Sequence, residues 1–128
     1  DVITNLVVSV SAIGIALTLS KLGVYDKLGN RLGLTAELGT LLSTSLGQKA
    51  AALTSPYTVT TSDVYYLAVV SKGSTLPTLH RGSNNVNIAP AIGSGSILFG
   101  SLVSQTDLPS SLTLAVGASP INFWIGAY

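Results

Sequence analysis

The sequence predicts an all-β fold, an antiparallel sandwich or barrel of about eight to ten strands. Short stretches rich in Val, Ile, Thr, Tyr and Leu recur along the chain, and clusters of Gly, Pro, Asn, Asp or Ser separate them. In places the apolar residues alternate with a period of two, as in Ile13, Ile15, Leu17 and Leu19. At 128 residues the chain is long enough for one domain with a real core, so we expect residues 1–128 to form a single domain.

The expected strands lie between the turn signals. We place them at residues 2–10, 13–25, 31–35, 48–54, 57–61, 64–71, 76–81, 96–103, 111–116 and 121–127. The clearest turn is YDKLGNRLG, residues 25–33. There Asp26 can bond its own backbone, and Gly29 and Asn30 tolerate a positive φ, so two strands can reverse direction.

Two details of local structure follow from the residue pattern. In the strand before this turn, Leu22 and Val24 should face one way, and Gly23 and Tyr25 the other. After residue 34 the alternation loosens, and LTAELGTLLSTSLG can form either a short helix near residues 35–45 or a crossing loop.

The composition is unusually poor in charge. Apolar residues make up 47% of the chain and charged residues 9%, against roughly 25% charged residues in an average soluble domain. The mean hydropathy is +0.57. The formal net charge is +1, and the cations are scattered singly, which predicts no nucleic-acid partner: Lys21, Lys27, Arg31, Lys49, Lys72 and Arg81.

Residues 2–20 contain no charge and are close to the ~20 residues that a membrane helix needs. Their polar residues, their β-branched residues and their period of two favour strands, so we expect no membrane insertion. No basic region precedes them, which argues against a signal peptide. Because the first residue is Asp1 rather than Met, we expect a fragment or processed part of a longer protein.

The residues that carry chemistry are few, and they predict a protein that is not an enzyme. The chain has no cysteine and one histidine, so we expect no metal site and no cofactor. His80 has no G-x-S-x-G serine to activate. Asp26 and Asp63 could form the carboxylate pair of a glycosidase, but both occupy positions where turns favour Asp.

The most polar segment is TLHRGSNNVN, residues 78–87. We interpret it as a candidate ligand-binding loop, in which paired donors and acceptors meet sugar hydroxyls: His80, Arg81, Asn84, Asn85 and Asn87. The alternative is an ordinary turn, with Arg81 capping a carbonyl or pairing with Asp107.

Tyr65 and Tyr66, in SDVYYLAVVSKG, present a similar choice. Alternation places Tyr65, Leu67 and Val69 on one face, and both faces of the strand are apolar, which predicts a central strand. Core tyrosines with satisfied hydroxyls are favoured over a stacking platform for sugar.

Four segments together resemble a known family. In order, LGVYDKLGNRLG, QKAAALTSPYTVTTSDVYYLAVV, STLPTLHRG and NFWIGAY resemble a β-sandwich module of phage tail-fibre, minor tail and other virion surface proteins, particularly of phages that infect actinobacteria. The resemblance extends from about Ile3 to Tyr128. It implies a jelly-roll-like sandwich, often a homotrimer at a fibre tip that meets the host surface, and it implies no catalytic residues.

The resemblance also bears on the apolar end of the chain. NFWIGAY would be a last strand held in the sheet, with Phe123, Ile125 and Ala127 on one face and Trp124 and Gly126 on the other. Low charge and a strand that is apolar on both faces suggest that one face meets a neighbouring subunit.

The leading hypothesis is a non-enzymatic phage virion surface module, a trimer in contact with other virion proteins. It would contribute to attachment to a glycan or protein of the bacterial cell surface. One alternative is an architectural capsid or tail decoration protein with no receptor. Two others are a carbohydrate-binding module of a secreted enzyme and hydrolysis of surface glycans by the chain itself.

Overall fold

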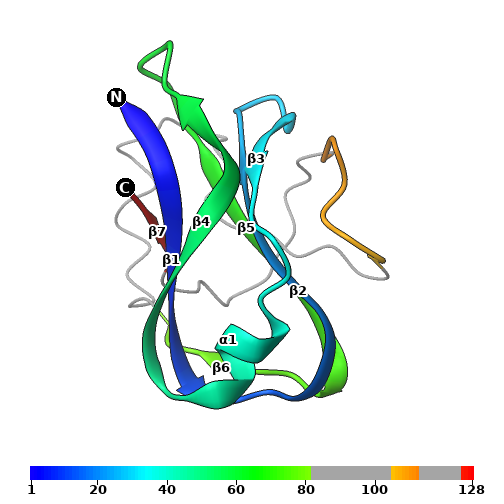
Figure 1. Cartoon of the computed structure of the whole chain (residues 1–128). Helices are drawn as coiled ribbons and strands as arrows, with labels where there is room; N and C mark the ends of the chain where they lie inside the picture. Colours follow the sequence, from blue (N-terminus) through cyan, green and yellow to red (C-terminus); the bar gives the residue numbers. More distant parts are fainter. Residues whose placement is uncertain (82–104, 113–124) are drawn as a thin grey trace.

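The structure is a computed structural model in which residues 1–81, 105–112 and 125–128 are described, and it contains two antiparallel sheets and one short helix (Figure 1). The elements follow one another as β1 (Val2–Ala12), β2 (Ile15–Tyr25), β3 (Arg31–Leu34), α1 (Gly39–Thr44), β4 (Gly47–Thr58), β5 (Tyr66–Thr75), β6 (Thr78–Leu79) and β7 (Ile125–Ala127). The predicted all-β sandwich is confirmed.

The strands are divided between the sheets so that the chain repeatedly crosses from one to the other. In the first sheet β1 pairs with β4 along one edge and with β6 and β7 along the other edge. In the second sheet β2 lies between β3 and β5. The steps from β1 to β2, from β3 to β4, from β4 to β5 and from β5 to β6 all change sheet, as in Greek-key sandwiches.

The core lies between the two sheets, and both contribute to it. The largest fully buried apolar residues come from β1, β2 and α1: Leu6, Val8, Val10, Leu22, Val24 and Leu42. Leu22 and Val24 share one face of β2, as predicted, and that face points into the core. Gly23 and Tyr25 face outward and contact Leu108 and Pro109 instead.

Several strand predictions need correction. The two strands expected at residues 48–54 and 57–61 are one strand, β4, which ends at Thr58. β5 runs from Tyr66 to Thr75 rather than over residues 64–71, and β6 is limited to Thr78 and Leu79. The strand expected at residues 96–103, and most of the one at 111–116, lie outside the described residues.

The period of two at the start of β2 is also interrupted. The ladder between β2 and β5 shifts register between Leu17 and Leu19, so these residues point to different faces. Leu17 packs against the core, whereas Leu19 is not part of the core cluster. Ile13 and Ile15, which precede Leu17 in the same alternation, are exposed. A bulge of one residue exchanges the two faces of the strand beyond it. The alternation of apolar residues in the sequence does not show where such a bulge lies.

The uncharged run at residues 2–20 forms β1 and the first part of β2. Among the residues that the structure describes, none belongs to a helix long and apolar enough to cross a membrane.

Of the two alternatives for residues 35–45, a short helix or a crossing loop, the structure has the short helix, α1. It closes the end of the sandwich where β1 turns into β2, because the Gly14 N–H donates to the Leu42 carbonyl at 3.1 Å. Leu42 is fully buried and Leu38, at the N-cap, is nearly so. Packing of these leucines holds a helix of six residues, which is too short to be stable alone.

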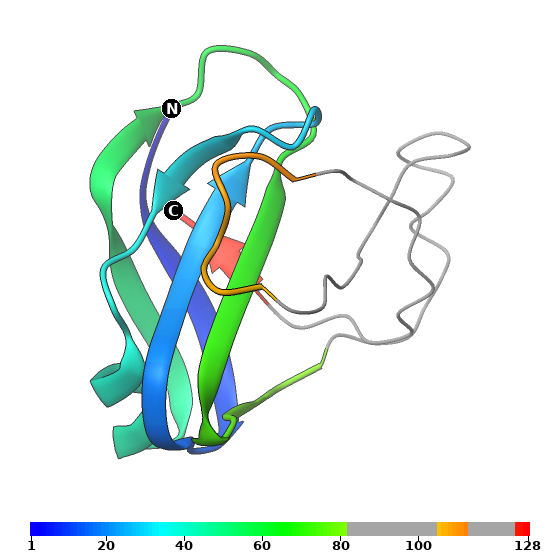
Figure 2. The same ribbon diagram turned by 90° about the vertical axis from the view of Figure 1, so that its right-hand side faces the viewer.

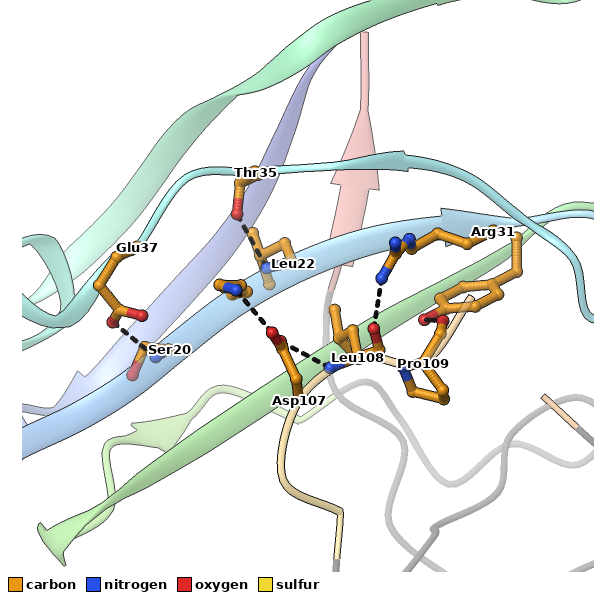
Figure 3. Close-up of polar contacts among 10 residues, drawn as sticks. Ser20, Leu22, Arg31, Thr35, Glu37, Asp107, Leu108 and Pro109 are labelled. Atoms are coloured by element: carbon orange, nitrogen blue, oxygen red, sulfur yellow. Dashed lines mark hydrogen bonds and ion pairs between the residues drawn. The ribbon is translucent and has the colours of Figure 1, made fainter. Parts of the chain in front are cut away.

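Between β3 and α1, side chains replace the missing strand partner of β2 (Figure 3). The Leu22 N–H donates to the Thr35 hydroxyl at 3.0 Å, and the Thr35 N–H donates back to the Leu22 carbonyl at 2.9 Å. The Ser20 N–H donates to the Glu37 carboxylate at 2.6 Å. The backbone of β2 is thus satisfied beyond the end of β3.

Because Thr35 is buried and accepts from the buried Leu22 N–H, Thr35→Val should lower the free energy of unfolding by about 1–3 kcal/mol. Urea denaturation measures this loss. Thr54→Val is the matched control, since the exposed Thr54 hydroxyl donates to the Leu34 carbonyl, where water can replace it. Equal losses in the two variants would contradict the contact at Leu22.

A segment far along the chain covers the outer face of the second sheet (Figures 2 and 3). We call residues 105–112 the outer strap. Lys21 Nζ pairs with Asp107 Oδ2 at 2.7 Å, and the Tyr25 hydroxyl donates to the Pro109 carbonyl at 2.8 Å. The Arg31 guanidinium donates to the Leu108 carbonyl. The strap explains why Tyr25 is fully buried on a face that points away from the core.

Candidate ligand-binding pocket

An open pocket of about 220 Å³ lies at the end of the sandwich opposite α1, between the β2–β3 turn and the β4–β5 loop. Both segments are seen together at the top of Figures 1 and 2. One wall, the turn wall, consists of Asp26, Lys27, Leu28 and Leu32. The other, the loop wall, consists of Tyr57, Thr60, Thr61, Asp63, Val64 and Tyr65. The volume is below the roughly 300–1,000 Å³ of pockets for drug-sized ligands, so the pocket fits one small group.

The turn wall is held by the carboxylate of Asp26. Its Oδ1 accepts from the backbone N–H groups of Leu28 and Asn30, both at 2.8 Å, and its Oδ2 accepts from Asn30 Nδ2 at 2.8 Å. These bonds, first of all the one from the Asn30 side chain, lower the pKa of Asp26. Gly29 has a φ of +87°, as predicted, but Asn30 does not have a positive φ. The turn therefore presents an ionised carboxylate in a fixed position.

The loop wall is built around two tyrosines. The rings of Tyr57 and Tyr65 meet edge to face, with centroids 6.0 Å apart and an interplanar angle of 61°. Both rings also pack against the core. The Tyr65 hydroxyl donates to the Thr61 carbonyl at 2.9 Å, a bond within the β4–β5 loop that holds its shape just before β5 begins. Hydrogen bonding to Tyr65, and then burial, raise the pKa of the Tyr57 hydroxyl, which stays neutral.

An ion pair joins the two walls. Lys27 Nζ lies 2.7 Å from Asp63 Oδ2, with 57% of the lysine and 31% of the aspartate side chain exposed. Each group shifts the other toward its charged form, so the pKa of Lys27 is raised and that of Asp63 is lowered. The Asp63 carboxylate also accepts from the Val64 N–H at 2.9 Å. The pocket thus holds two carboxylates, one ammonium group, two phenols and two threonine hydroxyls.

This set of groups suits binding rather than cleavage of a polyhydroxylated ligand. Carboxylates and hydroxyls exchange hydrogen bonds with sugar hydroxyls, and tyrosine rings supply apolar contact. Glycoside cleavage needs a carboxylic acid whose pKa is raised so that it can protonate the leaving group. The pKa values of Asp26 and Asp63 are both lowered, so neither supplies that proton near neutral pH.

The predicted binding loop is described only at its start. His80 and Arg81 are both exposed. His80 Nδ1 shares a hydrogen bond of 2.9 Å with the Ser9 hydroxyl, and the backbone N–H of His80 donates to the Ser9 carbonyl at 2.8 Å. Asn84, Asn85 and Asn87 lie outside the described residues, so this site stays a prediction. The Asp107 carboxylate, suggested as a partner of Arg81, pairs with Lys21.

The residues predicted to lie in the core or at an assembly interface have different positions in the structure. Tyr65 packs against the core and lines the pocket. Tyr66 pairs with Tyr25 on the outer face of the second sheet. In the described part of that sheet β5 pairs with β2 alone, so a central position for this strand stays a prediction. Ile125 packs against the core as part of β7, which pairs with β1; Phe123 and Trp124 lie outside the described residues.

The sequence raised Asp26 and Asp63 as a possible carboxylate pair, for which turn positions were the favoured alternative, but it did not place Tyr65 beside them. The signal that could have supported the grouping is the position of Asp26 and Asp63, each in a polar segment directly beside a strand of the second sheet. Within the described residues no group of three or more His, Cys, Asp or Glu side chains gathers to hold a metal ion.

The lowered carboxyl pKa values predict a loss of stability in acid. Asp26, Asp63 and Asp107 have lower pKa values in the folded chain than the unfolded value of about 3.9. Their stabilising effect is therefore complete above that value and is lost as the pH falls through the folded pKa values. The urea midpoint should be level near neutral pH and fall below about pH 5.

Asp107→Asn tests how much of this loss of stability in acid comes from the ion pair of the outer strap. It removes a carboxylate whose pKa is lowered first by Lys21, so the variant should lose less stability between neutral and acidic pH than the parent. An identical acid profile in both proteins would contradict the role of this ion pair.

Comparison with protein families, with curated proteins and with solved structures finds no match to this chain.

Proposed function

We propose that this chain is a non-enzymatic virion surface module that attaches a phage to a glycan of the bacterial envelope, with the pocket between the turn wall and the loop wall as its binding site. The observation that carries the proposal is the pocket itself. It brings two tyrosine rings, two ionised carboxylates and two threonine hydroxyls together at one end of a rigid sandwich.

The phage context rests on the order of the four segments that resemble virion surface modules. Two of them, residues 22–33 and 48–70, contain all the residues that line the pocket. The two-sheet sandwich agrees with the fold that the resemblance implies. The virion surface is the location that this function requires.

The opposite end of the sandwich supports assembly into a homotrimer or contact with other virion proteins. Four large aliphatic side chains near α1 and the β1–β2 turn are exposed to water, and such exposure of apolar surface is unfavourable: Ile13, Ile15, Leu46 and Leu76. The strand pairings place these four residues at the same end of the two sheets, because Val10 pairs with Gly47 in one sheet and Ile15 pairs with Thr75 in the other. An apolar end facing the particle would point the pocket outward.

The same apolar end favours the second candidate, an architectural decoration protein without a receptor. That function predicts particles that need the module for integrity but adsorb without it. Sedimentation of the isolated chain tests the assembly itself: we expect a species of three times the monomer mass, and a monomer at high concentration would contradict the trimer.

Binding of the fluorescently labelled protein to a panel of actinobacterial and other Gram-positive cells tests the attachment function. Thr60→Trp fills the pocket from an exposed position and leaves the core tyrosines in place. Thr44→Trp makes the same change at an exposed position of α1, at the opposite end, and serves as the matched control. We expect saturable binding to at least one host, lost in Thr60→Trp and retained in Thr44→Trp.

Cell binding that survives Thr60→Trp would contradict the pocket as the attachment site. No binding to any cell, by a protein shown to be folded and assembled, would favour the architectural function.

A further inference from the structure

The charges around the pocket do not balance, and this points to the class of sugar that it takes. Lys27 is the one cation among the lining residues, and its ammonium group is 2.7 Å from Asp63. Asp26 is the second carboxylate, and no lining cation is left to pair with it. The pocket therefore has a net charge of −1 when all three groups are ionised.

The carboxylate of Asp26 has room for a further donor. A carboxylate offers about four acceptor positions. Among the described residues, Oδ1 accepts from two backbone N–H groups and Oδ2 accepts from Asn30 Nδ2, and the Gly29 N–H adds a smaller contribution to the lowered pKa of the carboxylate. The hydrogen bond to Tyr65 is the main cause of the raised pKa of Tyr57, and the negative charge of Asp26 on the opposite wall is a smaller one.

The tyrosines add to this preference for positive charge. Neutral aromatic rings attract cations at their faces. Tyr57 and Tyr65 are both partly exposed at the pocket and meet edge to face, so at least one ring face is turned away from the other ring. A small cationic group on a ligand would meet a carboxylate oxygen and an aromatic face within a pocket of about 220 Å³.

Resting on the proposed glycan-binding function, we propose that the pocket selects a sugar with a free amino group, a hexosamine without its N-acetyl group. The protonated amine would neutralise the charge of Asp26 and approach the tyrosine rings, while the ring hydroxyls bond to Thr60 and Thr61. An N-acetyl group removes the positive charge and adds bulk. A uronic acid brings a third carboxylate to a pocket whose net charge is already negative.

Titrations of the full chain with glucosamine, glucose, N-acetylglucosamine and glucuronic acid test this selection, followed by amide chemical shifts in ¹H–¹⁵N spectra. At about pH 6 the amine is protonated, while Asp26 and Asp63 are ionised. Glucosamine should bind about three- to ten-fold more tightly than glucose and N-acetylglucosamine, and glucuronic acid most weakly.

Charge variants sharpen the test. Lys27→Gln makes the pocket more negative and should increase the preference for glucosamine over glucose, whereas Asp63→Asn should reduce it. Lys72→Gln, on β5 and outside the pocket, is the matched control and should leave the preference unchanged.

Equal affinities for glucosamine and glucose, or a preference that Lys27→Gln and Asp63→Asn do not alter, would overturn the amino-sugar selection and leave the glycan-binding function standing. Cell binding that is lost in Thr60→Trp, together with no response to any of the four sugars, would also overturn it. Cell binding that is indifferent to Thr60→Trp instead contradicts the proposed function.

Discussion

The Gly29→Ala variant is expected to lose about 3 kcal/mol or more of folding free energy. Gly29 has a φ of +87°, a conformation that costs a residue with a side chain about 1–3 kcal/mol. A Cβ atom there would also lie 2.1 Å from the carbonyl oxygen of Leu112 in the outer strap. Since the Leu112 N–H donates to the Gly29 carbonyl at 2.8 Å, the turn and the strap would have to separate.

Gly47→Ala separates the cost of the positive φ from the cost of the clash with the outer strap. Gly47 has a φ of +95°, so alanine there has a similar conformational cost, but a Cβ atom would meet nothing within 4 Å. Chemical denaturation of both variants should show the larger loss for Gly29→Ala. Equal losses would mean that the strap does not pack on the β2–β3 turn.

Leu22→Ala should cost about 2–5 kcal/mol, the range for deletion of a fully buried leucine. Leu22 is 0% exposed in the middle of β2, the central strand of the described second sheet, and belongs to the core cluster. Its removal leaves a cavity between two sheets whose strands cannot move together without losing their ladders.

The matched control is Leu28→Ala in the β2–β3 turn. Leu28 is 73% exposed, so its truncation should change the free energy of unfolding by less than about 0.5 kcal/mol. Urea denaturation of both variants, without ligand, makes the comparison. A loss for Leu28→Ala that matches the loss for Leu22→Ala would contradict the assignment of the core.

Local residue patterns predicted much of this fold. Alternation placed Leu22 and Val24 on one face of β2 and Tyr25 on the other, as the structure has them, and turn chemistry located the reversal at Asp26 and Gly29. Both depend on residues close together in the sequence. The last strand followed from the apolar chain end, and its pairing with β1 holds Tyr128 through hydrogen bonds to Asn5.

Features that depend on distant contacts were not predictable. The register shift between Leu17 and Leu19 turns these two leucines to different faces of β2, and the alternation of apolar residues in the sequence gives no sign of such a bulge. The outer strap joins Asp107 to Lys21, 86 residues away in the chain, which no local pattern encodes. The fully buried Tyr25 depends on this strap.

The pocket could be predicted only in its parts. Asp26 was recognised as a turn residue, which it is, since its carboxylate organises the β2–β3 turn. Asp26 also lines the pocket, together with Tyr57 and the ion pair of Lys27 and Asp63. This grouping arises because β2 pairs with β5, which brings the β2–β3 turn and the β4–β5 loop to the same end of the sandwich. A residue that serves a turn can therefore also line a site.

Mapping of a bound glycan on the protein tests the central claim most directly. The measurement is a ¹H–¹⁵N titration of the labelled chain with cell-wall glycan released from a strain that binds it. Amide shifts that gather at Thr60, Thr61, Asp63 and Tyr65, and are absent in Thr60→Trp, are the predicted result. Shifts that gather instead around His80 and Arg81, or at the α1 end, would contradict the pocket as the binding site.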